Sequence, residues 1–242
     1  MPTAESTRGG TPAARFHGTH AGATVVASIM RRIGRAIRGM DRPVIEKLQA
    51  DNASTPFRTL VSTMLSAQTR DPVTHQASLR LFAAADSPAA LAALPAKTIE
   101  RLIYPVSFYR NKARHLKVTA RDVLERFGGR TPTTMEQLLT LRGVGRKTAN
   151  LVLIVAHRSA DNICVDTHVH RIANRLGWVR TRTPDQTERA LYEVVPRRWW
   201  KLVNLYLVIW GQQVCRPVYP RCGACAVADV CPRIGVTREG RV

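Results

Sequence analysis

Four cysteines lie close together near the C-terminus of this 242-residue chain, and they are the residues most able to do chemistry. They are Cys215, Cys222, Cys225 and Cys231, with the spacing C-x6-C-x2-C-x5-C. Clustered thiols in an intracellular protein indicate metal ligation rather than disulfides. Only the middle pair forms the short C-x2-C motif that a zinc ribbon uses twice, so the spacing favours a [4Fe-4S] cluster, with zinc as the alternative. The fifth cysteine, Cys164, stands in an apolar run and is predicted to be a buried core thiol.

A glycine-rich turn at 141–150, with the sequence LRGVGRKTAN, is the second candidate site. Glycines permit positive φ and close approach of the backbone, and the unpaired amides at the start of the following helix bind anions. This pattern predicts a helix-hairpin-helix that holds a DNA phosphate without reading base sequence. An ordinary turn between packed helices is the alternative. The residues expected at the DNA are Gly143, Val144, Gly145 and Arg146.

Lys147 follows in the first turn of the second hairpin helix. The positive end of the helix dipole disfavours a second positive charge there, and a less protonated amine is a better nucleophile. Its stem shares a helix face with Leu151 and Ile154, so the amine is expected at the mouth of the hairpin. Taken alone, the helix leaves two roles open for Lys147, a nucleophile and a simple phosphate contact.

Asp166 ends a short apolar run and precedes an apolar helical pattern. This position predicts a helix N-cap, and a cap alone would explain the residue. Amides bonded to a carboxylate also keep it ionised, so Asp166 could accept a proton from Lys147 and stabilise positive charge on a sugar. His168, two residues later, is expected on the same DNA-facing surface.

The charge of the chain favours a polyanionic partner. It has 37 Lys and Arg against 17 Asp and Glu, a net charge of +20. Nucleic acid is the leading candidate, although ribosomal, chromatin and membrane-surface proteins share such charge. Arg216 and Arg221 lie between the first two clustered cysteines in a segment with two prolines, where they could meet phosphates or be plain surface charge.

Apolar residues recur at spacings of three and four from residue 24 onward, which predicts an all-α fold. The expected helices lie at 27–38, after Pro43, after a Thr55–Pro56 start, and at 72–84, 87–93, 97–103, 109–126, 133–140, 167–176, 184–194 and 198–212. Residues 1–22 are predicted to be disordered, with an organelle transit peptide as the alternative. No apolar run is long enough for a bilayer, so we expect a cytoplasmic bacterial protein without membrane contact.

Together these motifs, in this order, resemble the endonuclease III family from about residue 26 to 235. The resemblance implies two helical lobes: a six-helix barrel with the helix-hairpin-helix at 50–160, and a [4Fe-4S] domain made of 23–49 and 161–236, followed by a tail at 237–242. It implies a monomer that binds double-stranded DNA across the groove between the lobes.

The resemblance also implies a DNA glycosylase with AP lyase activity on oxidised pyrimidines and abasic sites. Lys147 would attack C1′, expel the base, form a Schiff base and promote β-elimination, with Asp166 as its partner. Gln68 matches the residue that fills the space left by the everted nucleotide, which costs a few kcal/mol to extrude. Phe108 matches the wedge on the opposite strand.

Three residues depart from the family pattern. Phe108 replaces a smaller aliphatic residue, Ser107 a frequent glycine and Arg142 a frequent proline, so the wedge loop is where lesion preference or turnover would differ. Two alternatives follow. Adenine and mismatch glycosylases share the hairpin, aspartate and cluster but lack the lysine, and a damage-sensing paralogue would bind DNA with little catalysis.

Overall fold

The computed structural model describes residues 22–50 and 54–240, and within these the regular secondary structure is entirely helical, which confirms the all-α prediction. The expected N-terminal extension lies, apart from residue 22, outside the described residues. So do residues 241–242 of the expected tail. None of the described helices is long and apolar enough to cross a membrane.

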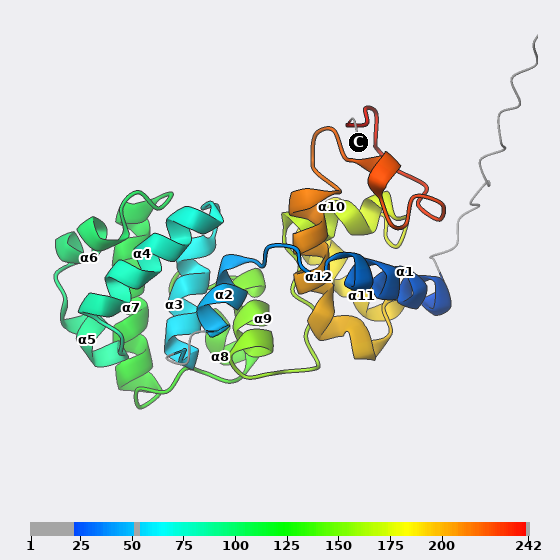
Figure 1. Cartoon of the computed structure of the whole chain (residues 1–242). Coiled ribbons are helices and arrows are strands. Elements are labelled where there is room, and N and C mark those ends of the chain that lie inside the picture. The colour runs from blue at the N-terminus through cyan, green and yellow to red at the C-terminus, as the bar shows by residue number, and fades with distance from the viewer. Residues whose placement is uncertain (1–21, 51–53, 241–242) are drawn as a thin grey trace, which may run out of the picture.

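Two groups of helices lie side by side (Figure 1). The first group consists of α2 (Val44–Ala50), α3 (Pro56–Ser66), α4 (Asp71–Ala84), α5 (Pro88–Ala93), α6 (Ala96–Ile103), α7 (Tyr109–Arg126), α8 (Met135–Leu139) and α9 (Arg146–Val155). The second group consists of α1 (Ala23–Ala36), α10 (Thr167–Arg175), α11 (Pro184–Val194), α12 (Trp200–Gln213) and the short 3-10 helices η1 (Arg197–Trp199) and η2 (Cys222–Ala224). We call them the hairpin lobe and the cysteine lobe.

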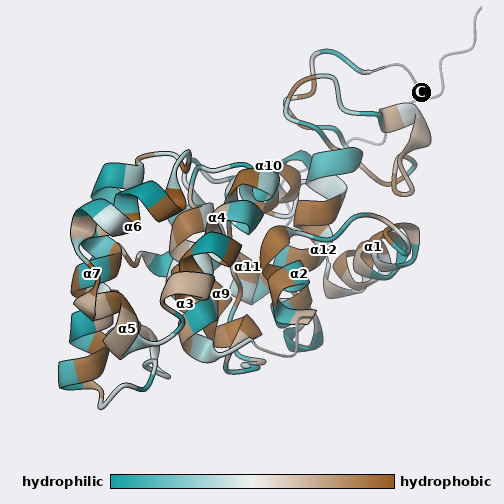
Figure 2. Cartoon of the chain, turned by 60° about the vertical axis from the view of Figure 1, so that its left-hand side comes forward, coloured by the Kyte–Doolittle hydropathy of each residue, from teal (hydrophilic) through white to brown (hydrophobic). Residues whose placement is uncertain are grey.

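Each lobe has its own apolar core, because most helices bury one side and leave the other hydrophilic, as the alternating colours of Figure 2 show. The core of the hairpin lobe extends from Phe57 to Leu153. In the cysteine lobe, α1 contributes apolar residues at helical spacing, among them Ile29 and Ile33, to a core shared with α10 and α12. The first described helix therefore packs with the last ones, so this lobe is built from both ends of the chain.

Local sequence signals fix where several helices begin. At α3 the Thr55 hydroxyl accepts a hydrogen bond from the Arg58 amide at 3.2 Å, and Pro56 occupies the first turn. This arrangement confirms the capped start expected from the sequence. Thr183 and Pro184 begin α11 in the same way.

A small third cluster lies where the lobes meet. Val44 and Ile45 of α2 pack with Leu151 of α9 and with Cys164, which precedes α10. Asp71 accepts a hydrogen bond from the Val44 amide at 3.2 Å. These contacts hold α2 against the helix that carries Lys147.

Candidate active site

The hairpin between α8 and α9 presents uncapped backbone amides. Gly143 has a φ of +80°, and a Cβ there would lie 2.7 Å from Nδ1 of His115. Both facts require glycine at this position. Gly145 is the N-cap of α9 and offers no side-chain cap, so the first amides of α9 remain available to an anion, whereas Val144 is buried and anchors the turn.

A cleft of about 840 Å³ between the lobes brings four of the predicted site residues together. Gln68, Lys147, Asp166 and His168 all line it. They come from the loop after α3, the first turn of α9 and the start of α10. The cleft is wide enough for a nucleoside, and its walls belong to both lobes.

Lys147 reaches this cleft from the first turn of α9 and is half-buried. Among the described residues its amine forms no hydrogen bond or ion pair. Behind the helix, the Cys164 thiol donates to the Lys147 carbonyl at 3.5 Å. Cys164 is fully buried, which confirms the buried core thiol expected from the sequence, and burial raises its pKa to about 12.

Asp166 is the N-cap of α10, as the sequence predicted. Its Oδ1 accepts hydrogen bonds from the amides of His168 and Val169, both at 2.9 Å. Two amide donors on one oxygen stabilise the carboxylate and fix its orientation. The other oxygen is left for the cleft.

His168 contacts the positive side chain next to it. Its Nδ1 lies 3.1 Å from Nη2 of Arg171. Burial lowers the pKa of His168, opposed by the charge of Asp166, while Arg171 lowers it further. Burial thus favours the neutral imidazole beside the cleft.

The Gln68 loop is held by a lysine to which the sequence analysis gave no role. The Lys112 amine donates to the carbonyls of Leu65 and Ala67 at 2.7 and 2.6 Å and to the Thr69 hydroxyl at 3.2 Å. Gln68 itself has a φ of +55°, an uncommon value for a side-chain-bearing residue. Burial and the charge of Lys147 lower the pKa of Lys112 to about 8.

The Phe108 loop is tied to the same loop, but Phe108 is not among the residues that line the cleft. The Ser107 amide donates to the Thr69 hydroxyl at 3.2 Å. Phe108 is the N-cap of α7, has a φ of +56° and is 63% exposed, so its ring is presented to solvent. An exposed ring on a strained backbone suits a wedge, and that role remains a prediction.

Arg146 is engaged within the protein, which the sequence did not indicate. Its guanidinium forms a bidentate pair with Glu188 of α11, at 2.5 and 3.1 Å, and the Glu188 side chain is only 3% exposed. The pair joins the first turn of α9 to the opposite lobe. The predicted DNA contact of Arg146 stays a prediction.

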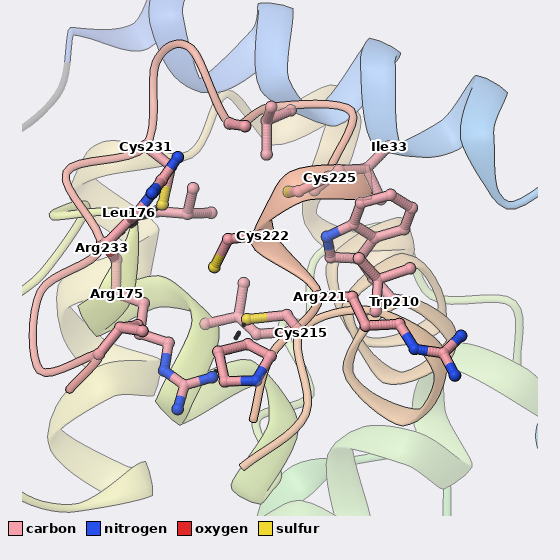
Figure 3. A pocket seen from close by; sticks show the side chains of 16 residues that line it. Ile33, Arg175, Leu176, Trp210, Cys215, Arg221, Cys222, Cys225, Cys231 and Arg233 are labelled. Atoms are coloured by element: carbon pink, nitrogen blue, oxygen red, sulfur yellow. Dashed lines mark hydrogen bonds between the residues drawn. The ribbon is translucent and has the colours of Figure 1, made fainter. Parts of the chain in front are cut away.

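The four C-terminal cysteines surround one cavity (Figure 3). Cys215 follows α12, Cys222 is the first residue of η2, Cys225 follows η2, and Cys231 lies beyond it. Their thiols point inward from different sides of the loop. Among the described residues no three His, Cys, Asp or Glu side chains lie close enough to hold one metal ion.

Arg175 of α10 lines this cavity beside the cysteines. Its Nη1 lies 3.4 Å from the Cys215 sulfur and 2.6 Å from the Arg216 carbonyl, and Nη2 donates to the Pro217 carbonyl at 2.8 Å. Its guanidinium thus orders the loop that carries Arg216 and Arg221. Arg221 extends away from the sulfurs in Figure 3, and a DNA contact by either arginine remains a prediction.

Comparisons with known proteins agree with this arrangement. Residues 61–197 match the family model described as HhH-GPD superfamily base excision DNA repair protein. The chain is 42% identical to endonuclease III of Thermotoga maritima over 196 residues, covering 81% of this chain and 92% of the relative. It is 41% identical to endonuclease III-like protein 1 of Gallus gallus over 213 residues, covering 84% and 75%. A solved trapped endonuclease III–DNA covalent intermediate is similar with a TM-score of 0.78 at 27% identity, covering 88% of this chain and 97% of that one.

Proposed function

The chain belongs to the endonuclease III family of base-excision DNA repair proteins and is a DNA glycosylase with AP lyase activity, and we propose that Lys147 is its nucleophile and Asp166 its catalytic carboxylate. The observation that carries this assignment is that both side chains, one from each lobe, line a single cleft. Lys147 follows a hairpin whose uncapped backbone amides can bind a phosphate, and the Asp166 carboxylate is held by hydrogen bonds from two backbone amides.

The reaction follows from these positions. A DNA phosphate held by the hairpin amides places the sugar of an everted nucleoside near Lys147. Asp166 accepts the amine proton, Nζ bonds to C1′, and the C1′–N bond breaks as the base leaves with a proton. Ring opening gives an iminium linkage between Lys147 and the sugar. Loss of a C2′ proton then expels the 3′ phosphate and nicks the strand.

The substrates we propose are duplexes that contain oxidised pyrimidines or abasic sites. Gln68, which lines the cleft from a loop fixed by Lys112, would enter the space left by the everted nucleotide. Phe108 would separate the bases of the opposite strand. Gly143, Val144, Gly145, Arg146, His168, Arg216 and Arg221 would support the backbone contacts.

The four clustered cysteines would hold a [4Fe-4S] cluster. They line one cavity, and only Cys222 and Cys225 form the short C-x2-C motif that a zinc ribbon uses twice, so the spacing favours a multi-iron cluster over zinc. When bound, the cluster cross-links the loop that carries Arg216 and Arg221. Protein purified without oxygen should be brown from thiolate-to-iron absorption, whereas colourless protein with one zinc per chain would contradict the proposal.

The activity is tested by borohydride trapping on a duplex with one thymine glycol. Wild-type protein should form a covalent adduct and nick the strand, because borohydride reduces the iminium between Lys147 and the sugar. Lys147→Gln should bind the duplex without forming the adduct. Tight binding by the wild type without any adduct or nick would instead indicate a damage sensor.

The chain is further proposed to act as a monomer on the chromosome in a bacterial cytoplasm, with an organelle as the alternative site. Sedimentation of the protein with a lesion duplex should give one protein per duplex.

A further inference from the structure

A glutamate that the reaction above does not use lies in the same cleft. Glu46 stands in the first turn of α2 and lines the cleft together with Lys147 and Asp166. Its backbone is well held, because Val44 and Ile45 pack on Leu151, one turn beyond Lys147. Glu46 thus lies on a helix, α2, that packs directly against α9, the helix that carries Lys147.

The Glu46 carboxyl has a charged neighbour in Arg42 but no hydrogen-bond partner among the described residues. In the described part of the chain it forms no hydrogen bond or ion pair, although the sequence contains 37 basic residues. Burial raises the pKa of Glu46, and the charge of Arg42 opposes this rise. A half-buried carboxyl without a partner lowers stability, so a reason for its presence in the cleft must be sought in a ligand.

Helix stabilisation does not supply that reason. Glu46 makes no bond to the first amides of α2, and a helix of seven residues has only a weak dipole. A DNA phosphate does not explain the presence of Glu46 in the cleft either, since a carboxylate repels a phosphate. The groups of an everted nucleotide that a carboxylate attracts are the N–H donors of the base.

The N–H of an oxidised thymine or uracil meets this requirement. Ring saturation removes the 5,6 double bond but leaves N3–H between two carbonyls. We propose that Glu46 is a specificity-determining residue that accepts the N3–H hydrogen bond of an everted thymine- or uracil-derived lesion. The inference rests on the proposed function, because it requires a lesion base in the Lys147 cleft.

A comparison of two substrates tests this role, because an abasic site has no base for Glu46 to bind. Glu46→Met keeps the approximate length of the side chain but removes both acceptor oxygens. Single-turnover excision of thymine glycol should fall about 10- to 100-fold, the range for a lost hydrogen bond to a charged group. Nicking and borohydride trapping of the abasic duplex should stay within about twofold of wild type.

Glu125→Met is the matched control, since Glu125 is an exposed glutamate on α7 outside the cleft lining, and both activities should be unchanged. Equal loss on both substrates, or no loss on either, would overturn the role of Glu46. Abasic nicking also reports that the variant is folded. If wild-type protein itself neither excises nor nicks, the proposed function fails rather than this inference.

Discussion

Asp166 combines two roles at one carboxyl group, and its chemistry can be separated from its capping. Oδ1 is occupied by the amides of His168 and Val169, and the other oxygen is left for the cleft. Asparagine caps helices as well as aspartate does, but it cannot accept a proton as a carboxylate does.

Asp166→Asn should therefore keep the stability and lose the chemistry. The free energy of unfolding, measured by urea titration, should change by less than about 0.5 kcal/mol, while trapping on thymine glycol should fall at least about 100-fold. Asp166→Ala, the comparison, should lose the same activity and about 1 kcal/mol of stability. Full activity in Asp166→Asn would show that the residue is only a cap.

At the scale of elements, Lys112 joins α7 to the loop that carries Gln68. The sequence could not reveal this contact, because the acceptors lie more than 40 residues away along the chain. The folded pKa of about 8 lies below the ordinary value of 10.5. Between these two values the unfolded chain binds more protons than the folded one, so stability should rise with pH across this window.

Replacing Lys112 by methionine removes that titration. We expect the difference in unfolding free energy, wild type minus Lys112→Met, to rise from pH 8 toward pH 10, because the cost of burying the charged amine disappears as it deprotonates. Urea titrations of both proteins at pH 7, 8, 9 and 10 measure it. A difference that is flat or falls would contradict the lowered pKa of Lys112.

The pair between Arg146 and Glu188 joins the first turn of α9 to α11. Glu188 is buried, so a neutral replacement removes the carboxylate that pairs with Arg146 at the junction of the lobes. Glu188→Gln should lower the unfolding free energy by about 2 to 4 kcal/mol and weaken abasic nicking, because Lys147 follows Arg146 directly.

The exposed pair between Arg197 and Asp161 provides the control for that variant. Both side chains are more than 60% exposed, so Asp161→Asn should cost less than about 1 kcal/mol and leave nicking unchanged. Equal effects of the two substitutions on stability would show that the Arg146 pair does not join the lobes.

For the molecule as a whole, the sequence predicted what local patterns encode. Helical periodicity, the Thr55 cap and the Asp166 cap could each be read from a few neighbouring residues, and the structure confirms them. Contacts between residues far apart in the chain could not be predicted from the sequence. Two contacts depend on how the helices pack against one another: the ion pair between Arg146 and Glu188, and the hydrogen bonds from Lys112 to the Gln68 loop. Helical periodicity does not predict which residues of two helices face each other.

The net charge of +20 makes DNA binding a property of the whole surface rather than of the cleft alone. Bound phosphates release counterions, so affinity should fall steeply with salt. For roughly six or more phosphate contacts, the Kd for a duplex with an abasic-site analogue should rise about 1000-fold between 50 and 200 mM salt. At saturating protein the single-turnover rate should change little, because the Lys147 step takes place inside the cleft. Equilibrium binding and single-turnover nicking over one salt series measure both, and a flat Kd would contradict phosphate contacts as the main source of affinity.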